Sequence, residues 1–337
     1  MSIFLDVGQG ECAIIVADGD AMIIDGGSSW ASQIVYSHLR NKLHLQNVKI
    51  MVATHPHEDH IGGLSGALNA VPVDLILSPV LEYDSKEFSE LTEYAYLQGS
   101  VMDVPFPGDV FSLGNATVTI VECWTDAWSV NDMSIVLRVD YGKRSFLFTG
   151  DAEEYLEYML VDSGQDLSAD VLKVGHHGSS SSSTMEFLDE ISPSYAVISC
   201  GKENIYGHPR QSTLDKLVAA GAEIFRTDLH GDILFHSDGE SLTYITEKVP
   251  EDIEQVYIAP KASFSFEIPE ECFIGNKSTK KFHNPNCFFA LNMSESNIIV
   301  FENYWEAKDA GFTECKSCSP RPPKRRVIYT LDMQPIE

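Results

Sequence analysis

The sequence predicts an α/β fold in which two β-sheets pack together with helices on their outer faces, followed by a small second region. Short strand-like runs separated by turn signals open the chain, as in SIFLDVG, CAIIVA and AMIID. Helical patterns follow at residues 30–43 and 152–164, and strand-like runs such as VKIMVAT and SFLFTG stand between them. The chain thus runs from a strand-rich segment through a helical one to a second strand-rich segment, and then alternates between helices and strands. This order is typical of two sheets covered by helices.

The charge distribution divides the chain into two regions of different character. The 337 residues have a formal net charge of −27. Residues 271–337 contain 9 Lys and Arg against 8 Asp and Glu, so residues 1–270 carry a net charge of −28. So acidic a region repels polyanions unless metal ions and a local basic patch reverse the field. The basic cluster RPPKRR, residues 321–326, is either a phosphate contact or a solvated tail.

Targeting signals are absent from the sequence as it stands. No run of 18 apolar residues occurs, so we expect no membrane span. The first residues lack the basic segment and apolar core of a signal peptide. We therefore expect a cytoplasmic protein, or a secreted one if a targeting segment has been removed.

The segment HPHEDH concentrates metal-ligand residues at the end of a predicted strand. Neutral imidazole is the commonest metal ligand in proteins, and carboxylate often accompanies it. His55 and His57 can face one point, while Asp59 and His60 turn toward a second point nearby. One loop can therefore hold two adjacent metals, and the glycines of the following IGG permit a tight turn into a helix.

HPHEDHIGG resembles the H-x-H-x-D-H signature of the metallo-β-lactamase superfamily. The resemblance covers about residues 2–247 and implies a four-layer αββα sandwich with a hydrolytic metal site. It implies that Asp25 of MIIDGG supports a ligand from behind, that Asp151 of FLFTGD bridges the metals, and that His176 of DVLKVGHHG is the last histidine ligand.

Longer segments are similar to the hydrolase domain of the ComEC-like proteins, DNA-uptake channels of competent bacteria. They are FLDVGQGECAII, NDMSIVLRVDYGKRSFLFTGD, DVLKVGHHGSSSSST and YGHPR. Because the chain lacks the channel region, it resembles the stand-alone relatives.

Most of the superfamily has a further histidine where this chain has Asn131. The first site would then be weak, with His55, His57 and Asp151, and the second complete, with Asp59, His60, Asp151 and His176. We expect one or two divalent metals there, Zn or Mn, with Fe also suited to mixed N/O ligation.

The implied chemistry is hydrolysis by metal-bound hydroxide, because a metal lowers the pKa of its water from 15.7 toward about 7. Asp59 is expected to act as both ligand and partner of the nucleophilic water. His208 of YGHPR is a second catalytic candidate, or else a structural loop histidine. Asn131, His177 and Ser179 are candidate substrate contacts, although the serine run 179–184 could equally be a flexible loop.

A second metal motif lies in the last part of the chain. His283-x₃-Cys287 and Cys315-x₂-Cys318 provide the four ligands of a structural, tetrahedral zinc. FIGNKSTKKFHNPNC and EAKDAGFTECKSC resemble the zinc-binding domain of the Ada DNA-repair protein. Ada uses four cysteines and methylates one of them, whereas this chain has His283 in the first position. The module is expected either to bind DNA or only to fold around zinc.

These observations predict four segments and one leading function. Residues 1–248 are the expected hydrolase domain, 249–270 a linker, 271–320 an Ada-like zinc-binding module and 321–337 a basic tail. The leading interpretation is a metal-dependent phosphodiesterase or nuclease whose partner is a phosphodiester, with DNA and RNA as candidates. The alternatives are a hydrolase of small phosphodiesters, such as those of phosphorylcholine, and a metal-binding interaction protein without turnover.

Overall fold

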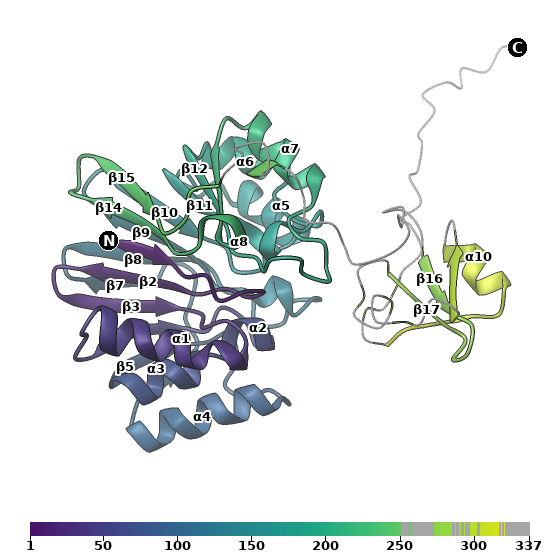
Figure 1. Cartoon of the computed structure of the whole chain (residues 1–337), viewed down its shortest axis with the longest axis horizontal. Helices are drawn as coiled ribbons and strands as arrows, with labels where there is room; N and C mark the ends of the chain where they lie inside the picture. The colour runs from purple at the N-terminus through teal and green to yellow at the C-terminus, as the bar shows by residue number, and fades with distance from the viewer. Residues whose placement is uncertain are drawn as a thin grey trace, which may run out of the picture. The chain divides into compact units, whose positions relative to one another are not determined.

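The computed structural model describes most of the chain as two compact units, Met1–Lys261 and Ala262–Glu337 (Figure 1). The described residues are 1–250, 256–257, 273–284, 287, 290, 293, 297–301, 304–316, 318 and 320. The predicted linker lies largely outside them, and the predicted basic tail, including RPPKRR, lies wholly outside them.

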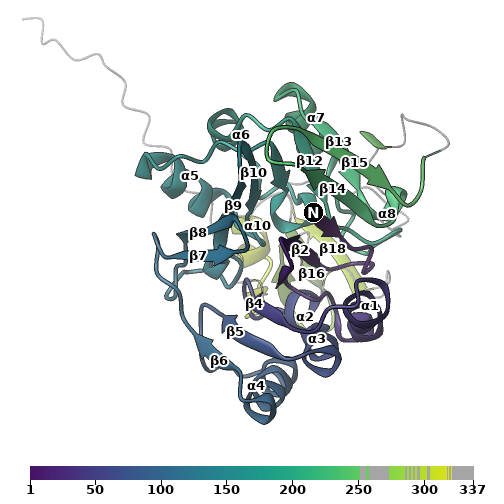
Figure 2. The same ribbon diagram turned by 90° about the vertical axis from the view of Figure 1, so that its left-hand side faces the viewer.

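The first unit is a four-layer αββα sandwich, which confirms the predicted fold class (Figure 1 and Figure 2). One sheet has the order β15-β14-β1-β2-β3-β4-β5-β6 and the other the order β13-β12-β11-β10-β9-β8-β7. The strands of the first sheet are β1 (Ser2–Phe4), β2 (Ala13–Ala17), β3 (Asp20–Ile24), β4 (Val48–Val52), β5 (Val73–Leu77), β6 (Val101–Asp103), β14 (Ile233–Ser237) and β15 (Leu242–Thr246). Those of the second are β7 (Val110–Leu113), β8 (Ala116–Glu122), β9 (Val136–Tyr141), β10 (Arg144–Phe148), β11 (Val171–Lys173), β12 (Tyr195–Ile198) and β13 (Glu223–Arg226).

Helices cover the outer face of each sheet. Those packed on the first sheet are α1 (Ser32–Ser37), α3 (Leu64–Ala70) and α4 (Lys86–Gln98). Those packed on the second are α5 (Glu154–Ser163), α6 (Met185–Ile191) and α7 (Gln211–Ala219). The short helices α2 (Glu58–Ile61) and α8 (Thr227–His230) follow strands of the two sheets.

Both faces of the central strands are buried, so these strands are hydrophobic along their whole length. In β4, Ile50 and Val52 enter the core between the two sheets, whereas Met51 enters the core beneath the helices. Continuous hydrophobic runs are typical of strands covered on both faces. The run VKIMV therefore packs into two different cores.

The parallel strands bring the chemically interesting loops to one edge of the sandwich. β3, β4 and β5 are parallel neighbours in the first sheet, and β10, β11 and β12 in the second. Carboxyl ends of parallel strands meet at one edge, and ligand sites lie there in open α/β sheets. Asp25 follows β3, His55 follows β4, Asp151 follows β10 and His176 follows β11.

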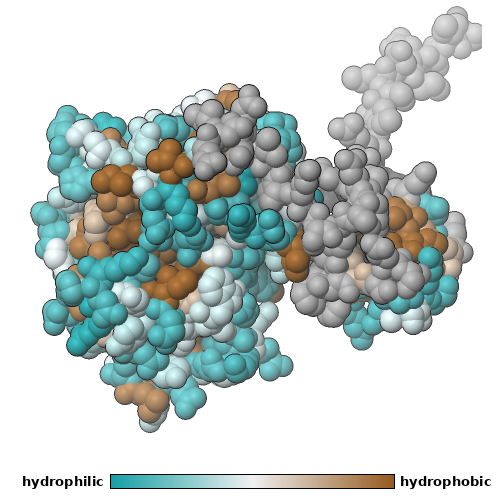
Figure 3. Space-filling model, in the orientation of Figure 1, coloured by the Kyte–Doolittle hydropathy of each residue, from teal (hydrophilic) through white to brown (hydrophobic). Residues whose placement is uncertain are grey.

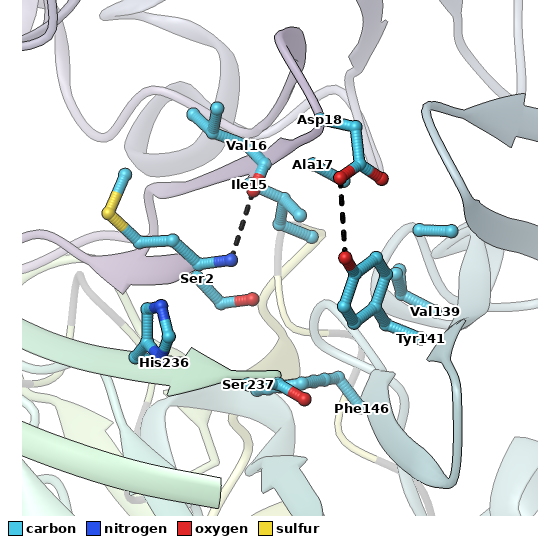
Figure 4. A pocket seen from close by; sticks show the side chains of 12 residues that line it. Ser2, Ile15, Val16, Ala17, Asp18, Val139, Tyr141, Phe146, His236 and Ser237 are labelled. Carbon is cyan, nitrogen blue, oxygen red and sulfur yellow. Dashed lines mark hydrogen bonds between the residues drawn. The ribbon is translucent and has the colours of Figure 1, made fainter. Parts of the chain in front are cut away.

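A pocket of about 210 Å³ opens between the sheets at the other edge (Figure 4). Its lining includes Ala17 and Tyr141, which end β2 and β9, strands antiparallel to β3 and β10. The Tyr141 hydroxyl donates a hydrogen bond to Asp18 at 3.3 Å. The pocket is therefore separate from the loops that carry the predicted ligands.

Among its described residues, the second unit contains a small sheet of order β18-β16-β17-β19 and the helix α10. The elements are β16 (Phe273–Asn276), β17 (Lys281–His283), β18 (Ile298–Phe301), α10 (Tyr304–Asp309) and β19 (Thr313–Glu314). Aromatic side chains form most of its core, with Phe282, Phe301, Tyr304 and Phe312 all buried.

The outer surface of the first unit is largely polar. On the face in Figure 3, hydrophilic side chains surround smaller groups of hydrophobic ones. None of the helices in the described part of the chain combines the length and apolarity needed to cross a bilayer.

Candidate metal centre

The loop after β4 and the helix α2 hold the HPHEDH side chains against Asp151. His55 and His60 are completely buried. His55 Nε2 lies 2.9 Å from His57 Nδ1 and 3.9 Å from Asp151 Oδ2. His60 Nε2 lies 3.2 Å from Asp151 Oδ1. Asp151 therefore faces ligand atoms from both halves of the loop, as a bridging carboxylate would.

A second group forms around Asp59, His60 and His177. His177 Nε2 lies 3.2 Å from Asp59 Oδ2, 3.3 Å from His60 Nε2 and 3.6 Å from Asp151 Oδ2. The Nδ1 atoms point away: that of His177 is 2.8 Å from Ser199 O, and that of His60 is 2.7 Å from Asp25 Oδ2. When each histidine donates its Nδ1–H to that oxygen, the lone pair of its Nε2 atom remains available to bind a metal.

This arrangement fits a divalent metal. Two imidazole lone pairs that face each other at 3.3 Å need a proton or a cation between them. Because the carboxylates of Asp59 and Asp151 lie next to these rings, a divalent cation with mixed N/O ligation fits this space better than a proton does.

The relative places of His176 and His177 differ from the prediction. His176 was expected to complete the group with Asp59 and His60, but His177 lies there instead. His176 Nε2 is 3.9 Å from Asp151 Oδ2, and its Nδ1 is 3.3 Å from Glu153 Oε1. The cause is local: both histidines have left-handed backbone, with φ of 48° and 53°. Such residues are costly outside glycine and concentrate at functional sites.

Burial and neighbouring charges set the protonation of these groups. Burial and the adjacent His60 lower the pKa of His55 well below its usual value, which keeps the ring neutral. Burial alone would raise the pKa of Asp151, but the surrounding histidines, His60 and His177 foremost, bring it well below the usual value. Neutral imidazole and ionised carboxylate are the forms that bind metals.

Hydroxyl groups that the sequence analysis did not single out orient the ligands. Asp25 accepts hydrogen bonds from the Thr54 amide at 2.8 Å and from the Thr54 hydroxyl at 2.7 Å, besides its contact with His60. Ser134 Oγ accepts a hydrogen bond from the Asp151 amide at 2.9 Å. Thr54 stands next to a ligand in the sequence, which was the only available signal.

The predicted substrate contacts occupy different environments. Asn131 Nδ2 lies 3.5 Å from the ring nitrogens of His176, so Asn131 stands beside the first group. Ser179 is buried, and its hydroxyl lies 3.0 Å from that of Ser181. Ser181 in turn donates to Glu153 Oε1 at 2.9 Å and lies 3.2 Å from His176 Nδ1. The serine run is thus tied to the site through Ser181.

His208 lies next to His176 with both ring nitrogens lacking a hydrogen-bond partner. The side chain is only 4% exposed, and its ring centroid is 5.6 Å from that of His176. Burial lowers the pKa of His208 well below its usual value, and the nearby His176 and His177 lower it further. A buried imidazole without a partner costs free energy unless a ligand satisfies it.

Comparisons with known proteins agree with this geometry. A family model described as the metallo-beta-lactamase superfamily matches residues 5–202. The chain belongs to the metallo-β-lactamase superfamily. Members of this superfamily are typically metal-dependent hydrolases. A second model, the metal binding domain of Ada, matches residues 267–321.

Among curated relatives within the superfamily, ComE operon protein 3 of Bacillus subtilis is 29% identical over 253 residues. The alignment covers 68% of this chain and 32% of that protein. Competence protein ComA of Neisseria gonorrhoeae is 32% identical over 68% of this chain and 31% of its own length. The chain thus spans about a third of the curated relatives it matches. Among solved structures, the metallo-beta-lactamase fold protein YhfI from Bacillus subtilis is 11% identical with a TM-score of 0.47, covering 72% of this chain and 98% of YhfI.

A buried ion pair joins the two halves of this superfamily fold behind the metal ligands. Lys173 Nζ lies 2.5 Å from Glu11 Oε2, with side-chain exposures of 0% and 1%. The Glu11 amide also donates to the Asp59 carbonyl at 3.0 Å. Lys173 ends β11, three residues before His176. The pair therefore links the loop of Asp59 to the strand that presents both histidines.

In the second unit, the four predicted zinc ligands come together. One ligand atom from each of His283, Cys287, Cys315 and Cys318 lies within 4.8 Å of the others. The Asn284 amide donates to Cys318 Sγ at 3.4 Å. Three sulfurs and one imidazole fit a structural zinc, and the four residues lie within the segment that matches the metal binding domain of Ada.

We predict that Lys173→Met lowers the free energy of unfolding by about 3–5 kcal/mol, because Glu11 is left as a buried, uncompensated charge. Chemical denaturation measures this change. The double variant Glu11→Leu/Lys173→Met should recover most of the loss, since it removes both charges.

The matched control is the exposed pair Lys143–Glu240, 2.7 Å apart with side-chain exposures of 69% and 71%. Lys143→Met should change stability by less than about 1 kcal/mol. Equal effects of Lys173→Met and Lys143→Met would contradict the assigned importance of the buried pair.

We predict that the full chain binds at least two equivalents of metal and that Cys318→Ser loses one of them. Thiolate ligation of a structural zinc contributes about 10–16 kcal/mol of apparent binding free energy, so loss of one ligand weakens it strongly. Elemental analysis of the purified variants gives the count. Cys123→Ser, at a buried thiol outside the cluster, should keep the full metal content.

Proposed function

We propose that the chain is a metal-dependent phosphodiesterase that cleaves nucleic acid. The observation that carries the proposal is that two ligand groups share His60 and both lie next to the Asp151 carboxylate, beside the unsatisfied ring of His208. Paired metal positions suit in-line displacement at a phosphodiester, where the attacking and leaving oxygens both need stabilisation. The names of the curated relatives, a competence protein and the "Recombination protein 2" of Haemophilus influenzae, fit a nucleic-acid substrate.

The metals would be held by residues already described. Asp59, His60 and His177 form one group of candidate ligands, and His55, His60 and Asp151 form the other. Asp151 also lies near His177, and His57 and His176 lie beside the second group. When bound, a divalent metal supplies a water of lowered pKa and positive charge for phosphoryl oxygens. Zn and Mn both suit this mixture of nitrogen and oxygen ligands.

The protein's own groups then orient and move protons. Asp59 is anionic, because the effects of the neighbouring His177 and His60 outweigh burial and lower the pKa of its carboxyl group. One Asp59 oxygen faces His177, and the carboxylate can accept a proton from the attacking water. Neutral His208 can donate an N–H to a phosphoryl oxygen, and the Asn131 amide can add a second donor.

The second unit supplies a candidate attachment for a polymer. Lys277, Lys280 and Lys281 are exposed in and beside the turn between β16 and β17. Such a group of lysines can neutralise phosphates, which is the main source of affinity for nucleic acid. The acidic first unit offers little of that attraction, so the module would do the recruiting.

A second candidate function is hydrolysis of a small phosphodiester with a cationic group, such as one of phosphorylcholine. The net charge of −28 over residues 1–270 favours it, because acidity attracts a cation and repels a polyanion. Cleavage rates of the purified protein on a nucleic acid and on a small phosphodiester, measured side by side, distinguish the two functions.

We predict that Asp59→Ala loses at least about 100-fold in phosphodiester cleavage, since it removes both a ligand and the partner of the attacking water. Single-turnover cleavage of an oligonucleotide and of a chromogenic phosphodiester measures the loss. Asp84→Ala, an exposed carboxylate, is the matched control and should cleave at the wild-type rate. Retained activity in Asp59→Ala would place the reaction elsewhere.

We predict that His208→Ala lowers kcat by about 10²–10³-fold, as removal of one donor to the developing charge does in other enzymes. Metal content should not change, because His208 lies outside both ligand groups. Elemental analysis alongside the kinetics separates the two roles. A fall in bound metal would identify His208 as a ligand instead.

A further inference from the structure

An aromatic rim lies on the two chain segments that contain Asn131 and Glu153, the neighbours of His176. It consists of Trp124 and Trp128 in the loop between β8 and β9, and Tyr155 in the first turn of α5. The rings of Trp124 and Tyr155 stack with centroids 5.6 Å apart and planes 25° from parallel. Trp128 is 78% exposed and Tyr155 is 51% exposed. Exposed aromatic side chains grouped near a candidate catalytic site can form a binding surface.

Hydrogen bonds connect this rim to the site. Ser129, which follows Trp128, donates to Glu153 Oε2 at 3.2 Å. The other oxygen of Glu153 lies 3.3 Å from His176 Nδ1. The Ser129 hydroxyl also accepts from the Asn131 amide at 3.2 Å. One carboxylate thus separates the loop of the two tryptophans from the histidine beside Asp151.

The charges around the rim limit what it can attract. Glu186, Glu154 and Glu157 raise the pKa of the neighbouring Tyr158 hydroxyl, so the surroundings are acidic. Attraction to phosphate is therefore weak here, and the aromatic faces are the favourable contact on offer. Bases stack on aromatic side chains whatever their sequence, because every base has a π-face.

We propose that Trp124, Trp128 and Tyr155 form a stacking platform for unpaired bases, which directs single-stranded nucleic acid to the metal site. The proposal rests on the proposed function and names its preferred substrate form. A quaternary ammonium ligand would also favour aromatic rings and acids, but it is enclosed by rings set at angles around it. The Trp124 and Tyr155 rings instead stack on each other with nearly parallel planes, and Tyr155 is half-exposed, so a base can continue this stack on its open side.

The test compares two short oligonucleotides of equal length and charge, oligo(dT) and an abasic strand. Binding is measured by fluorescence anisotropy on the full, metal-loaded chain carrying His208→Ala, which is expected to keep its metals and to slow cleavage. We expect oligo(dT) to bind about tenfold or more tightly than the abasic strand, because stacking needs bases. The ratio should hold as salt is raised, whereas both absolute affinities fall.

Trp128→Ala and Tyr155→Ala, both at exposed positions, should each reduce the oligo(dT) preference and leave the abasic affinity unchanged. Trp124→Phe should retain most of the preference, because a ring remains. The matched control is Tyr96→Ala on α4, where the side chain is 85% exposed and away from the metal ligands. Tyr96→Ala should change neither the oligo(dT) preference nor the affinity for the abasic strand.

Several results would overturn the platform. These are equal affinity for the two strands, no binding of either strand, or an equal fall in the affinities for both strands in Trp128→Ala. Displacement of oligo(dT) by choline and not by thymidine nucleotides would assign the rim to a cationic ligand. Hydrolysis of a chromogenic phosphodiester by the wild-type chain is measured separately. Absence of that activity with a preserved base preference refutes the proposed function alone, and the reverse result refutes the platform alone.

Discussion

The contact between Asp151 and His60 depends on nearly everything else in the first unit. Asp151 follows β10 in one sheet, and His60 lies in α2, after β4 of the other sheet. The two sheets must therefore pack face to face with their parallel strands ending at the same edge. The hydrophobic core between the sheets enforces this alignment, and the Glu11–Lys173 pair ties the same two halves together behind the ligands. A small relative shift of the sheets would separate the ligand groups that lie next to Asp151.

Concentrated negative charge is the second constraint. The buried Asp25 and Asp151 and the partly exposed Asp59 converge on a few histidines, and the first 270 residues are strongly acidic. Hydrogen bonds and histidine rings offset part of this repulsion, and divalent cations would offset the rest. The same acidity leaves little attraction for phosphate outside the metal centre. Under the proposed function, aromatic stacking beside the site and lysines in the second unit would be two physically distinct ways to bind a polymer despite that acidity.

Local backbone conformation is the third element. The left-handed His176 and His177 point one ring toward Glu153 and Asn131 and the other toward Asp59 and His60. Surrounding contacts hold this costly conformation, among them the bond from His177 Nδ1 to the Ser199 carbonyl. Two adjacent residues thereby serve two different parts of one site.

The sequence by itself determined the αββα fold, the superfamily, the HPHEDH loop and the cluster of one histidine and three cysteines in the second unit. These are local patterns, or patterns in fixed order, and a linear reading can detect them. Only the tertiary structure decided which of His176 and His177 faces His60, because that contact joins residues 117 positions apart and depends on two backbone torsions. It alone revealed Glu153 and Ser181 as neighbours of His176, the Lys173–Glu11 pair and the Trp124–Tyr155 stack. Each of these arises where distant segments meet, and residue type alone carries no record of such a meeting.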